Sequence, residues 1–478
     1  MNVKSFARLS LLSQCAFLAL AASTPAKAQV EADAAAPAGK RPNVQTAPNG
    51  VPVVDVAQPN AAGVSHNLFR SFNVGPAGAV PDNATVGVSA PPSPAPPPPA
   101  PPPPPLPPAP PPAPTPPAPP PPPEPPPPSC GRNVICNIES VVAKSGSGVS
   151  GTAAIPTTSS AGSVLVGRIA ANPLLQGSPA RLIVNEVTGG SPSSPMGRME
   201  VFGHAADVVI ANPWGMTCNG CGSIGVNRAS LISGRPNWSG SSLAGFSISA
   251  GMVYIGSAGL VGSGLRSLDL VGGSVPIDGA VRLPDPLSAL YVIAGPNEVD
   301  YTTLSTAASA RSNARPSHTV SISSAGGLYA DQIYVLSNEL GSGVYQGGVV
   351  EARTGNLALD VSGQLTHRGS SKAHNGTLAI SATDISANQA TLQGGQLVLV
   401  QSSTKLELSG GSGRGGDVML AAGTALNASG GTAIESTGDS RLSAGSEMTL
   451  AATRLTAGGH VALSQALQRG IALHSWPN

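Results

Sequence analysis

Aromatic and charged side chains are both scarce in this sequence. Only 3% of the 478 residues are Phe, Trp or Tyr, and 10% are Asp, Glu, Lys or Arg, whereas ordinary globular proteins carry roughly 25% charged residues. A core without bulky rings must stack many small aliphatic side chains, which favours a repetitive β architecture. The formal net charge of +1 provides no basic field, so we expect no nucleic-acid partner.

Motifs of catalysis and metal binding are also missing from the sequence. The seven His residues are scattered without an HExxH spacing, and Asp and Glu are sparse and mostly isolated. No phosphate-binding loop ending in Gly-Lys-Ser/Thr occurs. We therefore expect no cofactor, no metal site and no catalytic residue. The enzymatic alternative is a β-helical polysaccharide lyase or hydrolase.

Residues 1–28 predict a signal peptide. Lys4 and Arg8 precede an almost wholly apolar run, and a small-x-small cleavage site ends at Ala28. A membrane anchor is the alternative, but the run is shorter than the ~20 residues that span a bilayer. We expect an exported chain with no integral membrane segment after cleavage.

Proline is abundant, with 50 residues in the chain. Pro91–Pro128 is nearly pure Pro and Ala. Because proline lacks the amide donor and fixes φ, this segment predicts polyproline II in a disordered, exposed insertion. The alternative role is a ligand for aromatic grooves of another protein.

Four cysteines remain after signal cleavage, in two close pairs: Cys130 with Cys136, and Cys218 with Cys221. Export to an oxidising compartment favours two local disulfides. One zinc site with four thiolates is the alternative. Cys218 and Cys221 also form a CxxC motif, but Gly residues surround it and no helix follows, so we favour a structural disulfide over a redox centre.

Short β-strands recur through the second half of the chain. They repeat at intervals of about twenty residues with Gly, Ser, Thr or Asn between them, which predicts an all-β, parallel β-solenoid of roughly seventeen coils. A β-sandwich or barrel array is the alternative. The strands begin near Leu357, Leu378, Leu397, Val418 and Met448, and a further one comes sooner at Val461.

Three segments resemble the secretion domain shared by filamentous haemagglutinins, secreted haemolysins and contact-dependent inhibition proteins. Residues 49–80 look like the opening of that domain, 167–236 match its pieces in order and spacing, and 326–344 resemble the segment leading into the repeats. The resemblance implies a right-handed parallel β-helix with small extra-helical β elements. It also implies two-partner secretion, in which an outer-membrane transporter with periplasmic docking modules exports the chain from a Gram-negative bacterium.

The resemblance nominates site residues as well. Two Asn-Pro turns match family hallmarks, although both lack the usual second Asn. Each could shape a coil corner, since Asn closes an Asx turn and Pro presets φ, or could contact the transporter. The turns are Asn172-Pro173-Leu174-Leu175 and Asn212-Pro213-Trp214-Gly215, and the matching residues of the opening segment are Asn60, Asn67, Phe69 and Asn73.

These observations predict a modular organisation. After the signal peptide we expect a flexible lead at 29–48, then a two-partner secretion (haemagglutination activity) domain at 49–325 interrupted by the insertion at 91–128, then β-helical repeats at 326–478. The repeat pattern breaks after Leu463 without a recognisable capping coil. We therefore expect a truncated product, with a short natural form as the alternative.

The expected function is that of a secreted, non-enzymatic adhesin or haemagglutinin with an unknown receptor. The first alternative is the remnant of a toxin carrier of the contact-dependent inhibition or haemolysin type. The second alternative is the polysaccharide-degrading solenoid named above.

Overall fold

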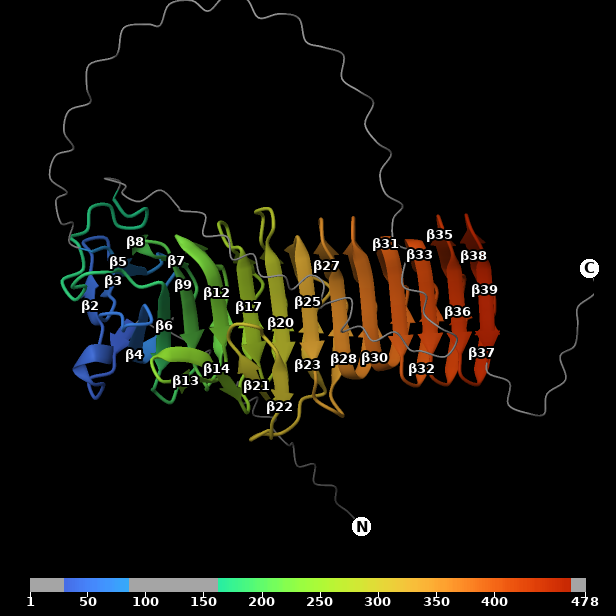
Figure 1. The fold of residues 1–478 in the computed structure, drawn as a ribbon, viewed down its shortest axis with the longest axis horizontal. Coiled ribbons are helices and arrows are strands. Elements are labelled where there is room, and N and C mark those ends of the chain that lie inside the picture. The colour runs from blue at the N-terminus through green and yellow to red at the C-terminus, as the bar shows by residue number, and fades with distance from the viewer. Residues whose placement is uncertain (1–29, 86–161, 466–478) are drawn as a thin grey trace, which may run out of the picture.

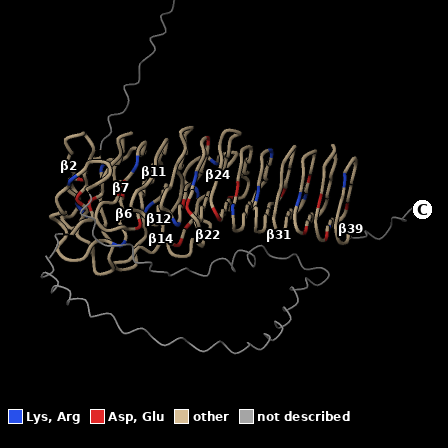
Figure 2. Tube along the Cα trace, turned by 90° about the horizontal axis from the view of Figure 1, so that it is seen from above, with Lys and Arg blue, Asp and Glu red and all other residues tan. Residues whose placement is uncertain are grey.

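The computed structural model describes residues 30–85 and 162–465. The predicted signal peptide, the proline insertion, and Cys130 and Cys136 lie outside the described residues. The described chain forms a long rod, in which successive turns of β-strands stack on one another, and small β elements are attached near one end (Figure 1). Lys and Arg are intermixed with Asp and Glu along this rod (Figure 2).

The rod is a parallel β-solenoid of about 13 turns. Its first face has one strand per turn, and we call it face A. Its strands are β4 (Val64–Phe72), β6 (Leu182–Val187), β9 (Ala206–Ala211), β12 (Val226–Ile232), β17 (Ser267–Gly272), β20 (Ala289–Ala294), β25 (Gln332–Ser337), β28 (Leu357–His367), β30 (Thr377–Asn388), β31 (Thr391–Ser402), β33 (Ser412–Ala422), β36 (Ser440–Ala444) and β39 (Val461–Gln465).

Two further faces complete each turn, and the long strands from β28 to β33 extend from one face into another. One face adds β10 (Met216–Cys218), β15 (Val253–Ile255), β18 (Val275–Ile277), β23 (His318–Ile322), β26 (Gly343–Gln346), β32 (Lys405–Ser409), β34 (Ala425–Ser429) and β37 (Glu447–Leu450). The other adds β7 (Arg198–Glu200), β11 (Cys221–Ile224), β16 (Leu260–Val261), β19 (Ala280–Arg282), β24 (Gly327–Ala330), β27 (Val349–Ala352), β29 (Ser370–Ala373), β35 (Ala433–Ser436) and β38 (Arg454–Ala457).

The predicted solenoid is confirmed, but it has fewer turns than the roughly seventeen that an even repeat length gives. Late turns are short, because Leu378 stacks on Leu357 and Val398 stacks on Leu378. Two earlier turns are nearly twice as long, since Leu268 stacks on Ala229 and Ile333 stacks on Leu290. The extra residues form strands outside the stack.

Those extra strands form an antiparallel sheet of β13 (Arg235–Ser239), β14 (Ser242–Ile248), β21 (Asn297–Asp300) and β22 (Thr306–Ala308). This extra-helical sheet lies along the side of the rod (Figure 1). Its Phe246 and Ile248 pack with Val209, Ile232 and other outward-facing residues of face A in one buried cluster. The predicted small extra-helical β elements are therefore present.

The first turn is covered at its open edge. β1 (Val30–Ala32) pairs antiparallel with β4. After the short 3-10 helix η1 (Ala38–Lys40), a second small sheet follows, made of β2 (Asn43–Thr46), β3 (Pro52–Asp55), β5 (Val80–Asn83) and β8 (Phe202–Gly203). Within the predicted flexible lead, β1 thus covers an otherwise unpaired edge of β4, and β2 pairs antiparallel with β3.

One late predicted repeat, at Met448, lies on a different face from the others. β39, which contains Val461, stacks on β36, which stacks on β33. Met448 lies in β37, which stacks on β34 on another face. The pattern misses β36 because Leu442 is the one large apolar residue in that strand.

Inward-facing aliphatic residues form the core. Leu357, Leu378, Val398 and Val418 occupy one ladder along the rod, and all are fully buried. Each side chain is therefore packed against its counterparts in the turns above and below. We expect Leu378→Ala to lower the free energy of unfolding by about 3 kcal/mol, because it removes buried methyl groups and leaves a cavity.

A urea titration of the purified chain checks this expectation. The matched control is Thr449→Ala, at an exposed position of β37, which should change the free energy of unfolding by less than about 0.5 kcal/mol. Equal effects of the two substitutions would contradict the assignment of the core ladder.

One interior corner of the solenoid is polar. His367 is 1% exposed, stacks on Gln346, and places Nε2 2.8 Å from Ser371 Oγ. Burial lowers the pKa of His367 to about 4 from its ordinary value of 6.5. The unfolded chain therefore binds a proton more readily than the folded chain between these pH values, and folding becomes less favourable as pH falls.

We expect the melting temperature of the wild-type chain to fall between pH 7.5 and pH 4.5 by more than that of His367→Gln, which lacks the titrating ring. Thermal melts of both chains at the two pH values measure the difference. His367→Gln can be less stable at both pH values without affecting the comparison. Equal pH dependence of the two chains would refute the role of His367.

Candidate functional site

Asn172 closes the first predicted Asn-Pro turn. Its side chain is fully buried, and Oδ1 accepts a hydrogen bond from the Leu174 amide at 2.8 Å. Nδ2 donates to the carbonyl oxygens of Val56 at 2.9 Å and Asp82 at 2.8 Å. The Asn172 side chain therefore ties this loop to the residue that follows β3 and to β5.

The other residues of this turn divide between core and surface. Leu175 is 2% exposed and joins the solenoid core, whereas Pro173 is exposed. Leu174 stands where the family usually has a second Asn, and the turn uses its backbone amide. Because any residue except proline supplies that donor, the departure leaves the turn intact.

Asn212 makes the same arrangement between β9 and β10. Its buried Oδ1 accepts a hydrogen bond from the Trp214 amide at 2.9 Å. Nδ2 donates to Ser191 O at 3.0 Å and to Ser193 Oγ at 2.9 Å. Two turns separated along the chain are thus built on one side-chain pattern.

Pro213-Trp214-Gly215 completes this corner. Gly215 has φ +96°, and a Cβ at this position would lie 2.9 Å from Met252 O in the next turn. Glycine is therefore required both by the backbone conformation and by the stacking of the next turn. Trp214 is 55% exposed and projects outward from the corner.

The opening segment is bonded to distant parts of the chain. Asn60 Nδ2 donates to Ser241 O at 2.7 Å, and its Oδ1 accepts from two amides of its own loop. Asn67 is buried, and its Oδ1 accepts from the Ala57 amide at 2.8 Å. Both side chains hold loops in place.

Two other residues of this segment are equally engaged. Phe69 is buried and packs edge-on against Phe72, with ring centroids 4.9 Å apart. Asn73 Oδ1 accepts a hydrogen bond from the Ser194 amide at 2.8 Å. Asn73 thus bonds the residue next to Ser193, a partner of Asn212, and Asn67 bonds the residue next to Val56, a partner of Asn172.

The predicted Cys218–Cys221 disulfide is present, with Cα atoms 5.5 Å apart. Cys218 is 0% and Cys221 is 8% exposed, and Gly220 between them has φ +85°. The disulfide links the end of β10 to the start of β11 across this tight turn. Its position in the core favours a structural role for the pair.

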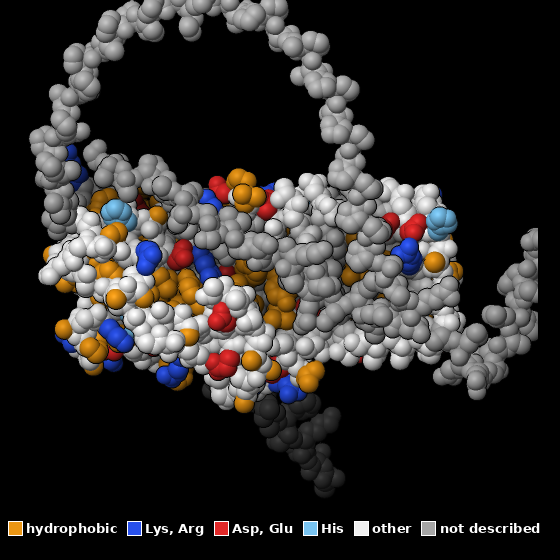
Figure 3. All heavy atoms as spheres, viewed as in Figure 1, with side chains coloured by type: hydrophobic (Ala, Val, Ile, Leu, Met, Phe, Trp, Pro, Cys, Tyr) orange, Lys and Arg blue, Asp and Glu red, His pale blue; other side chains and the backbone are white. Residues whose placement is uncertain are grey.

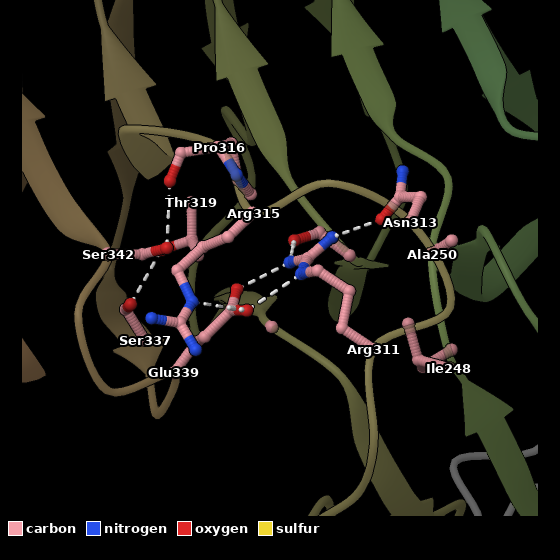
Figure 4. Close-up of polar contacts among 12 residues, drawn as sticks. Ile248, Ala250, Arg311, Asn313, Arg315, Pro316, Thr319, Ser337, Glu339 and Ser342 are labelled. Carbon is pink, nitrogen blue, oxygen red and sulfur yellow. Dashed lines mark hydrogen bonds and ion pairs between the residues drawn. The ribbon is translucent and has the colours of Figure 1, made fainter.

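Buried ion pairs are the site features that the sequence did not reveal. Arg311 donates from Nε and Nη2 to the two carboxylate oxygens of Glu339 at 2.7 and 2.5 Å, and its Nη2 also donates to Gly273 O (Figure 4). Arg315 Nε lies 3.5 Å from the same carboxylate. These contacts pin the segment that follows β22 to the corner after β25. Residues so far apart in sequence give no local signal.

Asp82 is a second feature missed from the sequence. Its side chain is buried in β5, and Oδ2 has no hydrogen-bond partner among the described residues. Desolvation raises the pKa of Asp82 to about 7, and the nearby Asp55 carboxylate adds to the effect. Asp82 is thus an ionisable residue next to the Asn172 turn, because Asn172 Nδ2 donates to the backbone carbonyl of Asp82.

No group of three or more His, Cys, Asp and Glu side chains suited to a metal ion occurs in residues 30–85 and 162–465. No helix in this part of the chain has the length and apolarity to span a membrane.

Asn212→Ala should lower the free energy of unfolding by about 3 kcal/mol, because it removes the three hydrogen bonds of a fully buried side chain and takes one partner from the buried Ser193 hydroxyl. Asn388→Ala is the matched control, since Asn388 is exposed at the end of β30. Urea titrations of both variants measure the difference, and a cost below about 1 kcal/mol for Asn212→Ala would argue against the turn as a structural element.

Comparison with known proteins identifies relatives of this chain. It is 30% identical over 368 residues to Toxin CdiA of Yersinia pestis, covering 76% of this chain and 9% of that protein. It is 36% identical over 211 residues to tRNA nuclease CdiA-2 of Burkholderia pseudomallei, covering 44% and 7% respectively. The chain thus spans less than a tenth of the length of these curated relatives.

Among solved structures, the crystal structure of a filamentous hemagglutinin secretion domain aligns with 91% of this chain and 98% of that chain, at a TM-score of 0.47 and 23% identity. The family model of the TPS (two-partner secretion) secretion domain matches residues 28–366. Because this match covers most of the chain, the protein belongs to the TPS secretion domain family.

Proposed function

We propose that this chain is an exoprotein delivered by a dedicated outer-membrane transporter, whose periplasmic docking modules recognise its secretion domain. The observation that carries the proposal is the match of residues 28–366 to the TPS secretion domain. Export then ends in the extracellular space or on the surface of a Gram-negative cell, where the solenoid acts as an adhesin.

The geometry of the Asn-Pro turns bears on how recognition takes place. Asn172 and Asn212 are fully buried, and their amide groups are hydrogen-bonded within the fold. A transporter can therefore read these side chains only before the solenoid folds. We propose that the two asparagines are recognised in the unfolded chain and close the coil corners after export.

A non-enzymatic role is proposed for the solenoid. Three of its buried carboxylates, Asp269, Asp331 and Glu339, are each paired with an arginine. Such pairs support loops and strand ends, and they leave these carboxylates unavailable as general acids or bases. A second candidate is the secretion module of a toxin carrier, which is favoured by the names of the relatives, Toxin CdiA and tRNA nuclease CdiA-2.

Secretion tests the first part of the proposal. The full chain, expressed in a Gram-negative host with its cognate transporter, should appear in the medium, and without the transporter it should stay in the periplasm. Asn212→Ala should reduce the secreted amount several-fold, whereas Asn388→Ala should be secreted like the wild type.

Retention of the wild-type chain in the periplasm with the transporter present would refute the proposal. Adhesion is measured separately, by adding the purified chain to host cells and counting the bound protein. Secretion without any cell binding would favour the toxin-carrier alternative over the adhesin.

A further inference from the structure

Two loops near the capped end of the rod enclose an open groove of about 690 Å³. One loop, 58–63, leads from β3 to β4, and the other, 176–181, leads into β6. The volume is within the range of roughly 300–1,000 Å³ typical of ligand sites. Neither loop contributes a charged side chain other than Arg181.

Side-chain hydrogen bonds hold the two walls together. Gln58 Oε1 accepts from the Gln176 amide at 2.6 Å, and Gln58 Nε2 donates to Gln176 O at 3.3 Å. Asn60 fixes the other side by bonding two amides of its own loop and Ser241 O. The groove is therefore formed before any ligand arrives, which lowers the entropic cost of binding.

The Arg181 guanidinium lies along the groove. Gly63, with φ +76°, makes room for it, because a Cβ there would lie 2.8 Å from Arg181 Nε. Nη2 is 3.5 Å from Ala62 O, a long contact. Arg181 forms no ion pair with another residue of the described chain. It is thus an exposed cation with donors to spare in a preformed groove.

The other lining groups suit a polyhydroxylated ligand. The Gln176 side-chain amide both donates and accepts hydrogen bonds, Ser178 adds a hydroxyl, and Pro59 and Pro179 add apolar rings. A guanidinium binds carboxylates in a bidentate fork. We propose that this groove binds an acidic sugar of the uronic or sialic acid class, with Arg181 on its carboxylate.

This inference rests on the proposed adhesin function and names the class of ligand. Carboxylates with a large apolar body, such as fatty acids, fit less well, because the groove contains no large aliphatic or aromatic side chain. Neutral sugars meet the same hydroxyl-binding groups but leave Arg181 without a partner. The expected preference is therefore for the carboxylate-bearing sugar over its neutral counterpart.

Titration calorimetry or ligand-observed NMR on the full secreted chain tests the proposal, with sialyllactose, a glucuronic-acid-terminated disaccharide and lactose as probes. At least one acidic probe should bind, and lactose should bind at least about tenfold more weakly. Arg181→Gln should weaken binding of the acidic probe by about tenfold or more and leave lactose unchanged.

Two further variants keep the test interpretable. Arg70→Gln is the matched control, since Arg70 is exposed on β4 and does not line the groove. Ala61→Trp fills the groove while keeping Arg181, and should abolish binding. All variants should melt at the wild-type temperature, because the substituted side chains are exposed.

Failure of both acidic probes to bind, or binding that Arg181→Gln does not change, would overturn the proposal. Binding of the transporter's isolated docking modules in place of the sugars, weakened by Arg181→Gln, would also overturn it and assign the groove to secretion. Cell adhesion without sugar binding would reject the groove and leave the adhesin function standing. Sugar binding by a chain that no transporter secretes would support the groove and reject the proposed secretion.

Discussion

Hydrogen bonding between successive turns is the constraint on which the rest of this structure depends. A single turn cannot satisfy its own backbone groups or bury its own apolar stripe, so each turn is stable only against its neighbours. The first turn has no neighbour on one side, and β1 pairs with β4 at that edge. The small sheet that contains β2, β3, β5 and β8 packs Val44 and Val54 against the core cluster. The ordered N-terminal segment is thus a requirement of the stack.

Stacking also determines what the corners can contain. Successive turns stack closely at their corners, so the backbone groups of a corner must find hydrogen-bond partners within the fold. Asn172 and Asn212 satisfy this requirement with one acceptor and two donors each. Because Asn172 and Asn212 are completely buried, a partner can contact these side chains only in the unfolded chain.

The sequence predicts what is periodic or local and misses what is neither. The spacing of Leu357, Leu378 and Val418 predicts the solenoid correctly, whereas β36 escapes notice because Leu442 alone represents it. The Asn-Pro turns are visible because each closes within four residues. Contacts such as Asn60 with Ser241 depend on the path of the chain between them, which no local pattern encodes.

The few charged residues of this chain differ in where they lie. On the face shown in Figure 3, charged side chains are dispersed among uncharged ones. Two of the buried pairs lie where the chain leaves or rejoins the stack, whereas Arg353 pairs with Asp331 between two stacked turns. Arg228 pairs with Asp269 on face A, donates to Tyr301 O at 2.8 Å and lies over the Tyr301 ring.

Arg311 pairs with Glu339 where the chain returns from the extra-helical sheet. Breaking such a buried pair costs about 3–5 kcal/mol, because one charge is left without a partner. In the stacked turns, the ladder of backbone hydrogen bonds fixes the register, and Arg353 with Asp331 adds a buried pair at one corner. The two pairs at the excursions hold strands that the backbone ladder does not connect to the stack, which is a task that the stacking of turns cannot perform.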